Sequence, residues 1–333
     1  MKKIFINGKF LCQKTTGVQR YAIEIIKCLD DMVNDEISFA VITPSKEYIV
    51  NELPLKKIEM IEVKGKPNYY WEQIKLANYC KKHKPDDLLN LCNIAPIMFP
   101  GSCTIHDLGC IDAPNGFSWK QRFIYKFINK RNIKKYKHLF TVSNTMKQRL
   151  EDYYKIDGVI VTYNGYEHML NVTEKKPDIA LPEHFYFTLG SLNPNKNFKA
   201  ILKIAKNEPN NMFVITGKKA KSFADEEYEN LPNVIFTGYL TDSEIKYMYS
   251  HCQAFLFPSL YEGFGIPPME ALASGCQKVI CNDIPVLREV YDGMCAFVNF
   301  DGNVVLPDDF TNNVGTIKYS WVEAANIILN TLK

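Results

Sequence analysis

The sequence predicts an α/β protein of two domains, each built on a parallel sheet that helices cover on both faces. Short apolar runs typical of buried strands alternate with segments of helical periodicity. A polar segment at 171–182, NVTEKKPDIALP, interrupts this alternation with two prolines and no periodicity. The chain has 333 residues, which is enough for two cores of ordinary size. We therefore expect domains at 1–172 and 173–318, followed by a C-terminal helix at 319–333.

In the first domain, apolar runs predict strands at 2–6, 38–42, 88–92, 104–107, 139–143 and 159–163. Helical spacing predicts a first helix from Val18 and further helices at about 71–82, 119–135 and 145–154. One face of the first helix is apolar and carries Val18, Tyr21, Ala22, Ile25, Ile26 and Leu29. Gly17 precedes this helix, where backbone N–H groups without helical partners form an anion site.

In the second domain, the same criteria predict strands at 185–189, 212–216, 234–237, 254–257 and 278–281. Helices are predicted at about 197–206, 222–230, 242–249 and 268–274. The last helix, at 320–332, has one apolar face that carries Trp321, Ala324, Ala325, Ile328 and Leu332.

Composition excludes several classes of protein. With 46% hydrophobic and 23% charged residues, the chain is of the ordinary globular type. No apolar stretch approaches the roughly 18 residues that a membrane-spanning helix needs, and the start, MKKIFING, is typical of a first strand and not of a signal peptide. The ten cysteines form no C-x-x-C pair, so buried free thiols are expected and structural zinc is not. We expect a cytoplasmic protein.

The net charge of +3 hides an asymmetry between the halves. Residues 1–170 hold 26 Lys and Arg against 18 Asp and Glu, a balance of +8, and residues 171–333 hold 14 against 19, a balance of −5. The two halves are therefore expected to face different partners.

The most informative stretch is 255–293, which predicts a strand, a glycine-containing loop, a helix and a second strand. Glu262 in the loop and Glu270 in the helix lie eight positions apart. Backbone N–H groups around Phe264, Gly265 and Ile266 have no obvious strand partner, so they are available to a hydroxyl-rich or anionic ligand. The alternative is that Glu262 is a solvated loop residue and Glu270 a glutamate favoured by the helix dipole, and spacing alone does not decide between them.

Residues 258–275, PSLYEGFGIPPMEALASG, resemble the E-x7-E signature of the retaining family-4 glycosyltransferases of the GT-B fold. The resemblance implies two Rossmann-like domains facing a cleft, with a C-terminal helix that typically returns to the first domain. It also implies that a nucleotide-diphosphate sugar binds the second domain and the acceptor the first. Glu270 would lie near the ribose, and Glu262 with the backbone of 264–266 would hold the sugar hydroxyls.

The segment 190–197, GSLNPNKN, resembles the family's diphosphate-binding loop, G-x-x-x-x-[RK]-K-N, in every fixed position except Asn195. Lys196 corresponds to the lysine that binds the donor diphosphate. Ser191 in this segment and Asn197, at the start of a helix, are further expected donor contacts. Ser191 and Asn195 stand at the two positions where the family's companion arginine would be expected. The site therefore has less positive charge than is usual in the family. A solvated turn lysine is the alternative for Lys196.

Further matches fall in the first domain. His106 and Asp107 resemble a family pair in which the histidine lies close to the donor sugar, and Asp107 would orient the imidazole or support the loop; on sequence alone, a structural role is the alternative. Gly17 and Arg20 fit a G-[IV]-x-R-Y loop whose glycine approaches the diphosphate and the acceptor. Ser143 and Asn164 also match family positions, with local turn chemistry as the alternative. The candidate acceptor or support residues are therefore Arg20, Asp107, Ser143 and Asn164.

The sequence lacks D-x-D, H-E-x-x-H and G-x-x-x-x-G-K-[ST] motifs. We therefore expect no metal site and no cofactor beyond the donor substrate. The charge of the leaving diphosphate would be stabilised by Lys196 and by helix N-termini.

The stretch 119–138 carries eight Lys or Arg among apolar residues at helical spacing. A helix packed on a sheet with a solvated basic face explains this pattern. The other hypothesis is peripheral contact with the anionic inner face of the plasma membrane, where a lipid-diphosphate-linked acceptor would be presented. Nucleic acid is not expected as a partner, because no RNA-binding aromatic motif accompanies these basic residues.

The sequence thus predicts a retaining, metal-independent hexosyltransferase that moves a sugar from a nucleotide-diphosphate sugar to a saccharide or lipid-linked saccharide. By analogy with the family, the context is cell-surface polysaccharide assembly such as that of O-antigens, in which mannosyltransferases take part. Two alternatives stay open: a nucleotide-sugar epimerase of the same architecture, and a catalytically silent nucleotide-binding or scaffold subunit.

Overall fold

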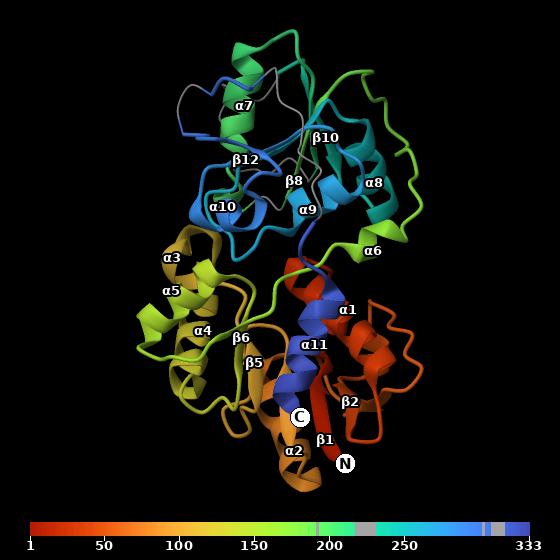
Figure 1. Cartoon of the computed structure of the whole chain (residues 1–333), viewed down its shortest axis with the longest axis vertical. Coiled ribbons are helices and arrows are strands. Elements are labelled where there is room, and N and C mark those ends of the chain that lie inside the picture. Colours follow the sequence, from red (N-terminus) through yellow and green to blue (C-terminus); the bar gives the residue numbers. More distant parts are fainter. Residues whose placement is uncertain (191–192, 217–230, 302–303, 308–316) are drawn as a thin grey trace. The chain divides into compact units, whose positions relative to one another are not determined.

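The structure is a computed structural model that describes residues 1–190, 193–216, 231–301, 304–307 and 317–333. The chain forms two compact units (Figure 1). The first unit comprises Met1–Gly165 together with Tyr319–Lys333, and the second comprises Tyr166–Lys318. The boundary expected between 172 and 173, and the polar segment 171–182, therefore lie inside the second unit.

The first unit is built on a parallel sheet with the strand order β3-β2-β1-β4-β5-β6-β7. Its strands are β1 Lys2–Asn7, β2 Ile37–Thr43, β3 Glu59–Glu62, β4 Asp87–Asn90, β5 Ser102–Thr104, β6 Leu139–Thr141 and β7 Ile160–Val161. The sequence predicted all of these except β3. This edge strand exposes Glu59 and Met60, so it lacks the apolar run by which buried strands are recognised.

The helical elements of this unit are η1 Gly8–Cys12, α1 Gly17–Met32, η2 Lys46–Tyr48, η3 Trp71–Leu76, α2 Ala77–His83, α3 Gly109–Asp112, η4 Pro114–Gly116, α4 Trp119–Asn132, α5 Asn144–Tyr154 and α11 Trp321–Leu332. The longer helices follow the predicted segments, whereas the short elements η1, η2, α3 and η4 were not predicted. The predicted helix at 71–82 starts as a π-helical segment, η3, before it continues as α2. Such segments are uncommon and often lie at functional sites.

The C-terminal helix α11 belongs to the first unit, where it lies beside α1 (Figure 1). Trp321 at its start is buried and meets the ring of Tyr21 on α1 edge-on, with ring centroids 6.0 Å apart. The Tyr21 hydroxyl in turn lies 2.8 Å from Thr162 Oγ1. The core of the first unit therefore needs a segment from the far end of the chain.

In its described residues, the second unit holds a parallel sheet with the strand order β10-β9-β8-β11-β12-β13. Its strands are β8 Tyr186–Leu189, β9 Phe213–Thr216, β10 Val234–Gly238, β11 Ala254–Phe257, β12 Val279–Asn282 and β13 Ala296–Val298. Its helical elements are α6 Glu167–Leu170, η5 Pro194–Lys196, α7 Phe198–Asn207, α8 Asp242–His251, α9 Ile266–Ala273 and α10 Pro285–Tyr291. The predicted helix at 222–230 lies outside the described residues, and β13, α6 and α10 were not predicted. The α/β class with two parallel sheets is confirmed.

The ten cysteines are free. Seven of them are buried as expected, whereas Cys12, Cys28 and Cys92 are only partly buried. Among the helices of the described ranges, none combines the length and the apolar content needed to cross a bilayer.

The contact between α11 and α1 generates a first prediction. We expect Trp321→Ala to lower the free energy of unfolding of the first unit by about 3–5 kcal/mol, because it leaves a large cavity in a packed core. Val322→Ala is the matched control, since the Val322 side chain on the same helix is 50% exposed. Urea unfolding followed by circular dichroism measures both variants. Equal stability of the two variants would contradict the assignment of α11 to this core.

Candidate functional site

Two loops of the second unit emerge at the same edge of its sheet because β8 and β11 are parallel neighbours. The loop after β8 leads through η5 to α7, and the loop after β11 leads to α9. The backbone N–H of Leu260 donates to the carbonyl of Asn195 over 2.8 Å, which ties one loop to the other. Ligands of open α/β sheets bind at this edge.

The two loops bring Lys196 and Glu262 together. The ammonium Nζ of Lys196 lies 2.5 Å from Oε1 of Glu262, and it also lies 5.5 Å from the ring centroid of Phe257. The side chains of Lys196 and Glu262 are 24% and 13% exposed, so the pair is accessible but shielded from much of the solvent. This arrangement excludes the alternative in which Lys196 and Glu262 are separate, solvated loop residues.

Gly265 fixes the turn from the loop into α9. Its φ is +85°, and a Cβ atom built there would lie 2.7 Å from Cδ2 of Leu287, so both backbone conformation and space call for glycine. The carbonyl of Gly265 accepts a hydrogen bond from the hydroxyl of Tyr291. The side chains of Phe264 and Ile266 are buried on either side of this glycine. The turn is therefore rigid, and it presents the start of α9 at the sheet edge.

Glu270 lies within α9, and each of its carboxylate oxygens has a partner. His168 Nε2 on α6 lies 2.9 Å from Oε1, and the hydroxyl of Tyr249 on α8 donates to Oε2 over 3.2 Å. Burial and the nearby carboxylate raise the pKa of Tyr249 well above its ordinary value, so its hydroxyl stays a donor. Glu270 is thus held in place by two residues that the sequence analysis did not select.

The described residues from Asn193 to the start of α7 are also held by local contacts. Asn193 Oδ1 accepts from the N–H of Asn195, and Asn197 caps α7 in the left-handed region with a φ of 51°. Among the described residues, the buried Nδ2 of Asn197 has no hydrogen-bond partner. An orphaned buried donor costs about 1–3 kcal/mol, which is consistent with a site that awaits a polar ligand. Ser191, the other predicted donor contact in this loop, lies outside the described residues.

In the first unit, His106 is 5% exposed and follows β5. Its ring nitrogen Nε2 lies 2.8 Å from the carbonyl oxygen of Leu91, so Nε2 carries the proton. The backbone N–H of His106 donates to Oδ1 of Asn93 over 2.7 Å. Tyr21 packs edge-on against the imidazole, with ring centroids 4.8 Å apart. Burial lowers the pKa of His106 from 6.5 to about 4. His106 is therefore a neutral imidazole at physiological pH, with its proton on Nε2.

Asp107 supports the loop that follows. Its Oδ1 accepts from the N–H of Gly109 over 2.7 Å at the start of α3. This contact fits the loop-supporting half of the prediction for Asp107, whereas Nε2 of His106 is oriented by the Leu91 carbonyl.

The remaining predicted residues also belong to the first unit. Gly17 is the first residue of α1. Arg20 follows one turn later, and its Nη1 lies 3.9 Å from Oε1 of Glu24. Ser143 is the buried N-cap of α5 and accepts from the N–H of Met146 over 3.1 Å, which is the local turn chemistry weighed as its alternative. Asn164 is buried, and its Oδ1 has no partner among the described residues.

Known proteins resemble the chain over part of its length. Residues 171–298 match the family model of the Glycosyl transferases group 1. Over 214 residues the chain is 30% identical to the O-antigen chain mannosyltransferase RfbU of Salmonella typhimurium, an alignment that covers 62% of this chain and 58% of that protein. It is 27% identical over 215 residues to the serotype-specific mannosyltransferase WbdA of Escherichia coli, covering 56% of this chain and 26% of that one. The chain therefore spans 58% of the length of the first relative and 26% of the second.

Solved structures share the fold. Sucrose-phosphate synthase from Thermosynechococcus elongatus superposes with a TM-score of 0.67 at 15% identity, covering 100% of this chain and 90% of that one. Anabaena Alr3699/HepE, in complex with UDP and glucose, superposes with a TM-score of 0.61 at 16% identity, with the same coverage.

The chain thus has the GT-B fold of these glycosyltransferases, as the sequence predicted. Residues 171–298, within its second unit, match the group 1 glycosyl transferase model, which agrees with the glycosyltransferase resemblance of the sequence. The roles of the individual site residues stay predictions.

The buried imidazole of His106 generates a pH prediction. Its folded pKa of about 4 lies below the ordinary 6.5, so its contribution to stability is complete above pH 6.5 and is lost as the pH falls toward 4. At 1.36 kcal/mol per pKa unit, the full loss is about 3 kcal/mol. We expect His106→Gln, which cannot be protonated, to lose less stability than the wild type between pH 7 and pH 4. Urea titrations at both pH values measure the free energy of unfolding of the two proteins. If both lose the same amount between pH 7 and pH 4, burial does not lower the pKa of His106.

Proposed function

We propose that the protein is a retaining glycosyltransferase that moves a sugar from a nucleotide-diphosphate sugar to a saccharide or lipid-linked saccharide acceptor. The observation that carries this proposal is the Lys196–Glu262 pair at the sheet edge of a group 1 glycosyl transferase domain. It supplies a cation for a diphosphate and a carboxylate for sugar hydroxyls, the two chemistries that a nucleotide-sugar donor requires.

The ion pair also suggests how donor binding proceeds. In the absence of ligand, the carboxylate of Glu262 forms an ion pair with the ammonium of Lys196, with 2.5 Å between Oε1 and Nζ. The donor diphosphate carries more negative charge than a carboxylate and displaces it. The displaced Glu262 then accepts hydrogen bonds from the sugar hydroxyls. Exchange of one anion for another keeps Lys196 neutralised in both states, which avoids the cost of an unpaired, partly buried charge.

Lys196 also stabilises the charge that develops on the leaving diphosphate. In a front-face displacement, the leaving phosphate oxygen accepts the proton of the acceptor hydroxyl, so the reaction needs neither a dedicated base nor a metal ion. We propose that Glu270, held by His168 and Tyr249, accepts from the ribose hydroxyls with its remaining lone pairs.

We assign donor binding to the second unit and acceptor binding to the first. The neutral imidazole of His106 and the N-terminus of α1 at Gly17 are the proposed ligand-facing groups of the first unit. Arg20 and Asn164 are proposed to contact or support the acceptor.

The names of the relatives suggest the sugar and the setting. Both RfbU and WbdA are mannosyltransferases, so we propose mannosyl transfer in cell-surface polysaccharide assembly. We also propose that the protein works in the cytoplasm and meets the inner face of the plasma membrane through residues 119–138. The net positive charge of the first half of the chain favours this partner.

A thermal-shift screen tests the donor class. We expect one of UDP, GDP, ADP, dTDP and CMP to raise the Tm of the second unit's transition, with or without magnesium, because a ligand that binds only the folded state stabilises it. No shift with any nucleotide would overturn the donor site and favour a silent scaffold subunit. A shift followed by donor consumption without an acceptor would favour an epimerase.

Two substitutions test the ion-pair exchange. Lys196→Ala should weaken nucleoside diphosphate binding and slow transfer, each by an order of magnitude or more, because the phosphate loses a charged partner. Glu262→Gln should slow transfer similarly, yet bind the nucleoside diphosphate up to about fivefold more tightly, because an ion pair worth about 0.2–1 kcal/mol no longer competes.

Isothermal titration calorimetry measures the binding, and Lys203→Ala on the exposed face of α7 is the matched control. If Glu262→Gln binds the nucleoside diphosphate more weakly than the wild type, the carboxylate of Glu262 and the diphosphate do not compete for Lys196. The proposed exchange of these two anions is then wrong.

A further inference from the structure

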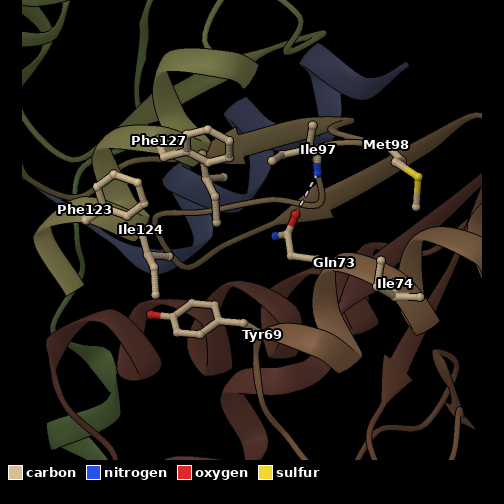
Figure 2. Close-up of a pocket in the computed structure, with 9 residues that line it drawn as sticks. Tyr69, Gln73, Ile74, Ile97, Met98, Phe123, Ile124 and Phe127 are labelled. Carbon is tan, nitrogen blue, oxygen red and sulfur yellow. Dashed lines mark hydrogen bonds between the residues drawn. The ribbon is translucent and has the colours of Figure 1, made fainter. Parts of the chain in front are cut away.

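The first unit contains an apolar pocket that the proposed transfer reaction does not use. Its volume is 410 Å³, within the range of roughly 300–1,000 Å³ that is usual for small-molecule sites. Figure 2 shows Phe123, Ile124 and Phe127 of α4 on one side, and Tyr69 and Ile74 of the η3 region on another. The loop that carries Ile97 and Met98 forms the third wall.

Hydrogen bonds hold the walls of this pocket together. Gln73 on η3 donates from Nε2 to the carbonyl of Ala95 over 3.2 Å. Its Oε1 accepts from the N–H of Ile97 over 3.0 Å (Figure 2). Asn132 on α4 donates to the same Ala95 carbonyl over 3.0 Å. Gln73 and Asn132 thus donate to the same carbonyl, and most of the lining side chains are apolar, with Gln73 and Tyr69 as the polar members.

The mouth of the pocket exposes large apolar side chains to solvent. Phe123 is 63% exposed, Phe127 42%, Met98 43% and Ile74 37%. Beside them, Trp119 at the start of α4 is 71% exposed. A cluster of this kind around a cavity marks a binding surface rather than scattered surface residues.

The surroundings of the mouth are strongly basic. Helix α4, which lines one side of the pocket, contains five Lys or Arg and no Asp or Glu. The guanidinium carbon of Arg131 lies 4.7 Å from the ring centroid of Phe127, and Nζ of Lys81 lies 3.4 Å from Sδ of Met98. Nζ of Lys120 lies 5.7 Å from the ring centroid of Trp119. Cations thus sit directly beside the apolar side chains of the mouth.

We propose that this pocket binds a hydrocarbon chain of an anionic phospholipid and so fixes the first unit to the surface of an anionic bilayer. The inference takes its setting from the membrane contact proposed above, and it adds a defined lipid site. An apolar pocket ringed by cations matches an amphiphile with an apolar chain and an anionic headgroup. Exposed Trp, Phe, Lys and Arg on one helix are also the composition of helices that lie at membrane interfaces.

Vesicle co-sedimentation of the full chain tests the proposal with four variants. Ile74→Trp fills the pocket while it keeps the surface apolar, and Met60→Trp is its control because Met60 is similarly exposed, at 40%, on the edge strand β3. Arg131→Glu reverses one charge at the mouth. Lys56→Glu is its control, because the Lys56 side chain is 80% exposed in a different part of the unit.

We expect the wild type to bind vesicles of phosphatidylglycerol and phosphatidylcholine, and to bind pure phosphatidylcholine at least about tenfold more weakly. Ile74→Trp should lower the partition coefficient on anionic vesicles about tenfold, and Arg131→Glu at least about fivefold. Both controls should bind like the wild type. Phospholipids brominated on the chain should quench the fluorescence of Trp119, and the variant Trp119→Phe should lose this quenching.

Three results would overturn the proposal. Equal binding of Ile74→Trp and the wild type would show that the bilayer contacts the surface without a chain in the pocket, and would leave the proposed peripheral contact standing. Equal binding to neutral and anionic vesicles would remove the role of the cations. A change in sedimentation coefficient of Ile74→Trp without lipid would show that a second copy of the chain covers the pocket.

The nucleotide thermal shift is measured on the same variants. It should be unchanged in all of them, so a failure of the lipid site and a failure of the donor site are told apart.

Discussion

The donor site depends on the parallel pairing of β8 with β11, two strands that are distant in sequence. Parallel neighbours end at the same edge, so their following loops must meet there. Leu260 bonds to Asn195 across these loops, and Lys196 reaches Glu262. The buried run of β11 therefore does more than fill a core: it sets the position of the loop that carries the carboxylate. A strand slipped by one residue would turn its side chains to the opposite faces and separate the ion pair.

Much of this fold is predictable from the sequence because both sheets are parallel and buried on both faces. Their central strands read as short apolar runs, and their helices show a periodic apolar face. The elements that escaped prediction lack these signals. The edge strand β3 is exposed, β13 is short and half-buried, and the π-helical segment η3 has the same apolar spacing as an ordinary helix.

The residues of the candidate site also fall into those that the sequence predicts and those that it does not. Lys196, Glu262 and Glu270 could be found because a contiguous motif carries them. His168 and Tyr249 could not, because each touches Glu270 only after α6, α8 and α9 pack together. In the sequence, Tyr249 is one more aromatic residue of an amphipathic helix. The partners that orient a carboxylate are tertiary neighbours, and a local pattern contains no information about them.

Helix α4 shows why two interpretations of one pattern need not exclude each other. Its basic and apolar periodicity predicted either a helix packed on the sheet or a membrane surface. The structure buries Ile128 and Asn132 against the fold, yet it leaves Phe123 63% and Phe127 42% exposed. Burying such a side chain would contribute about 1.5–3 kcal/mol, so folding alone gives no reason for aromatic residues at these two positions. One stripe of the helix serves the core, and the neighbouring stripe, flanked by cations and open to a cavity, is suited to a partner outside the chain.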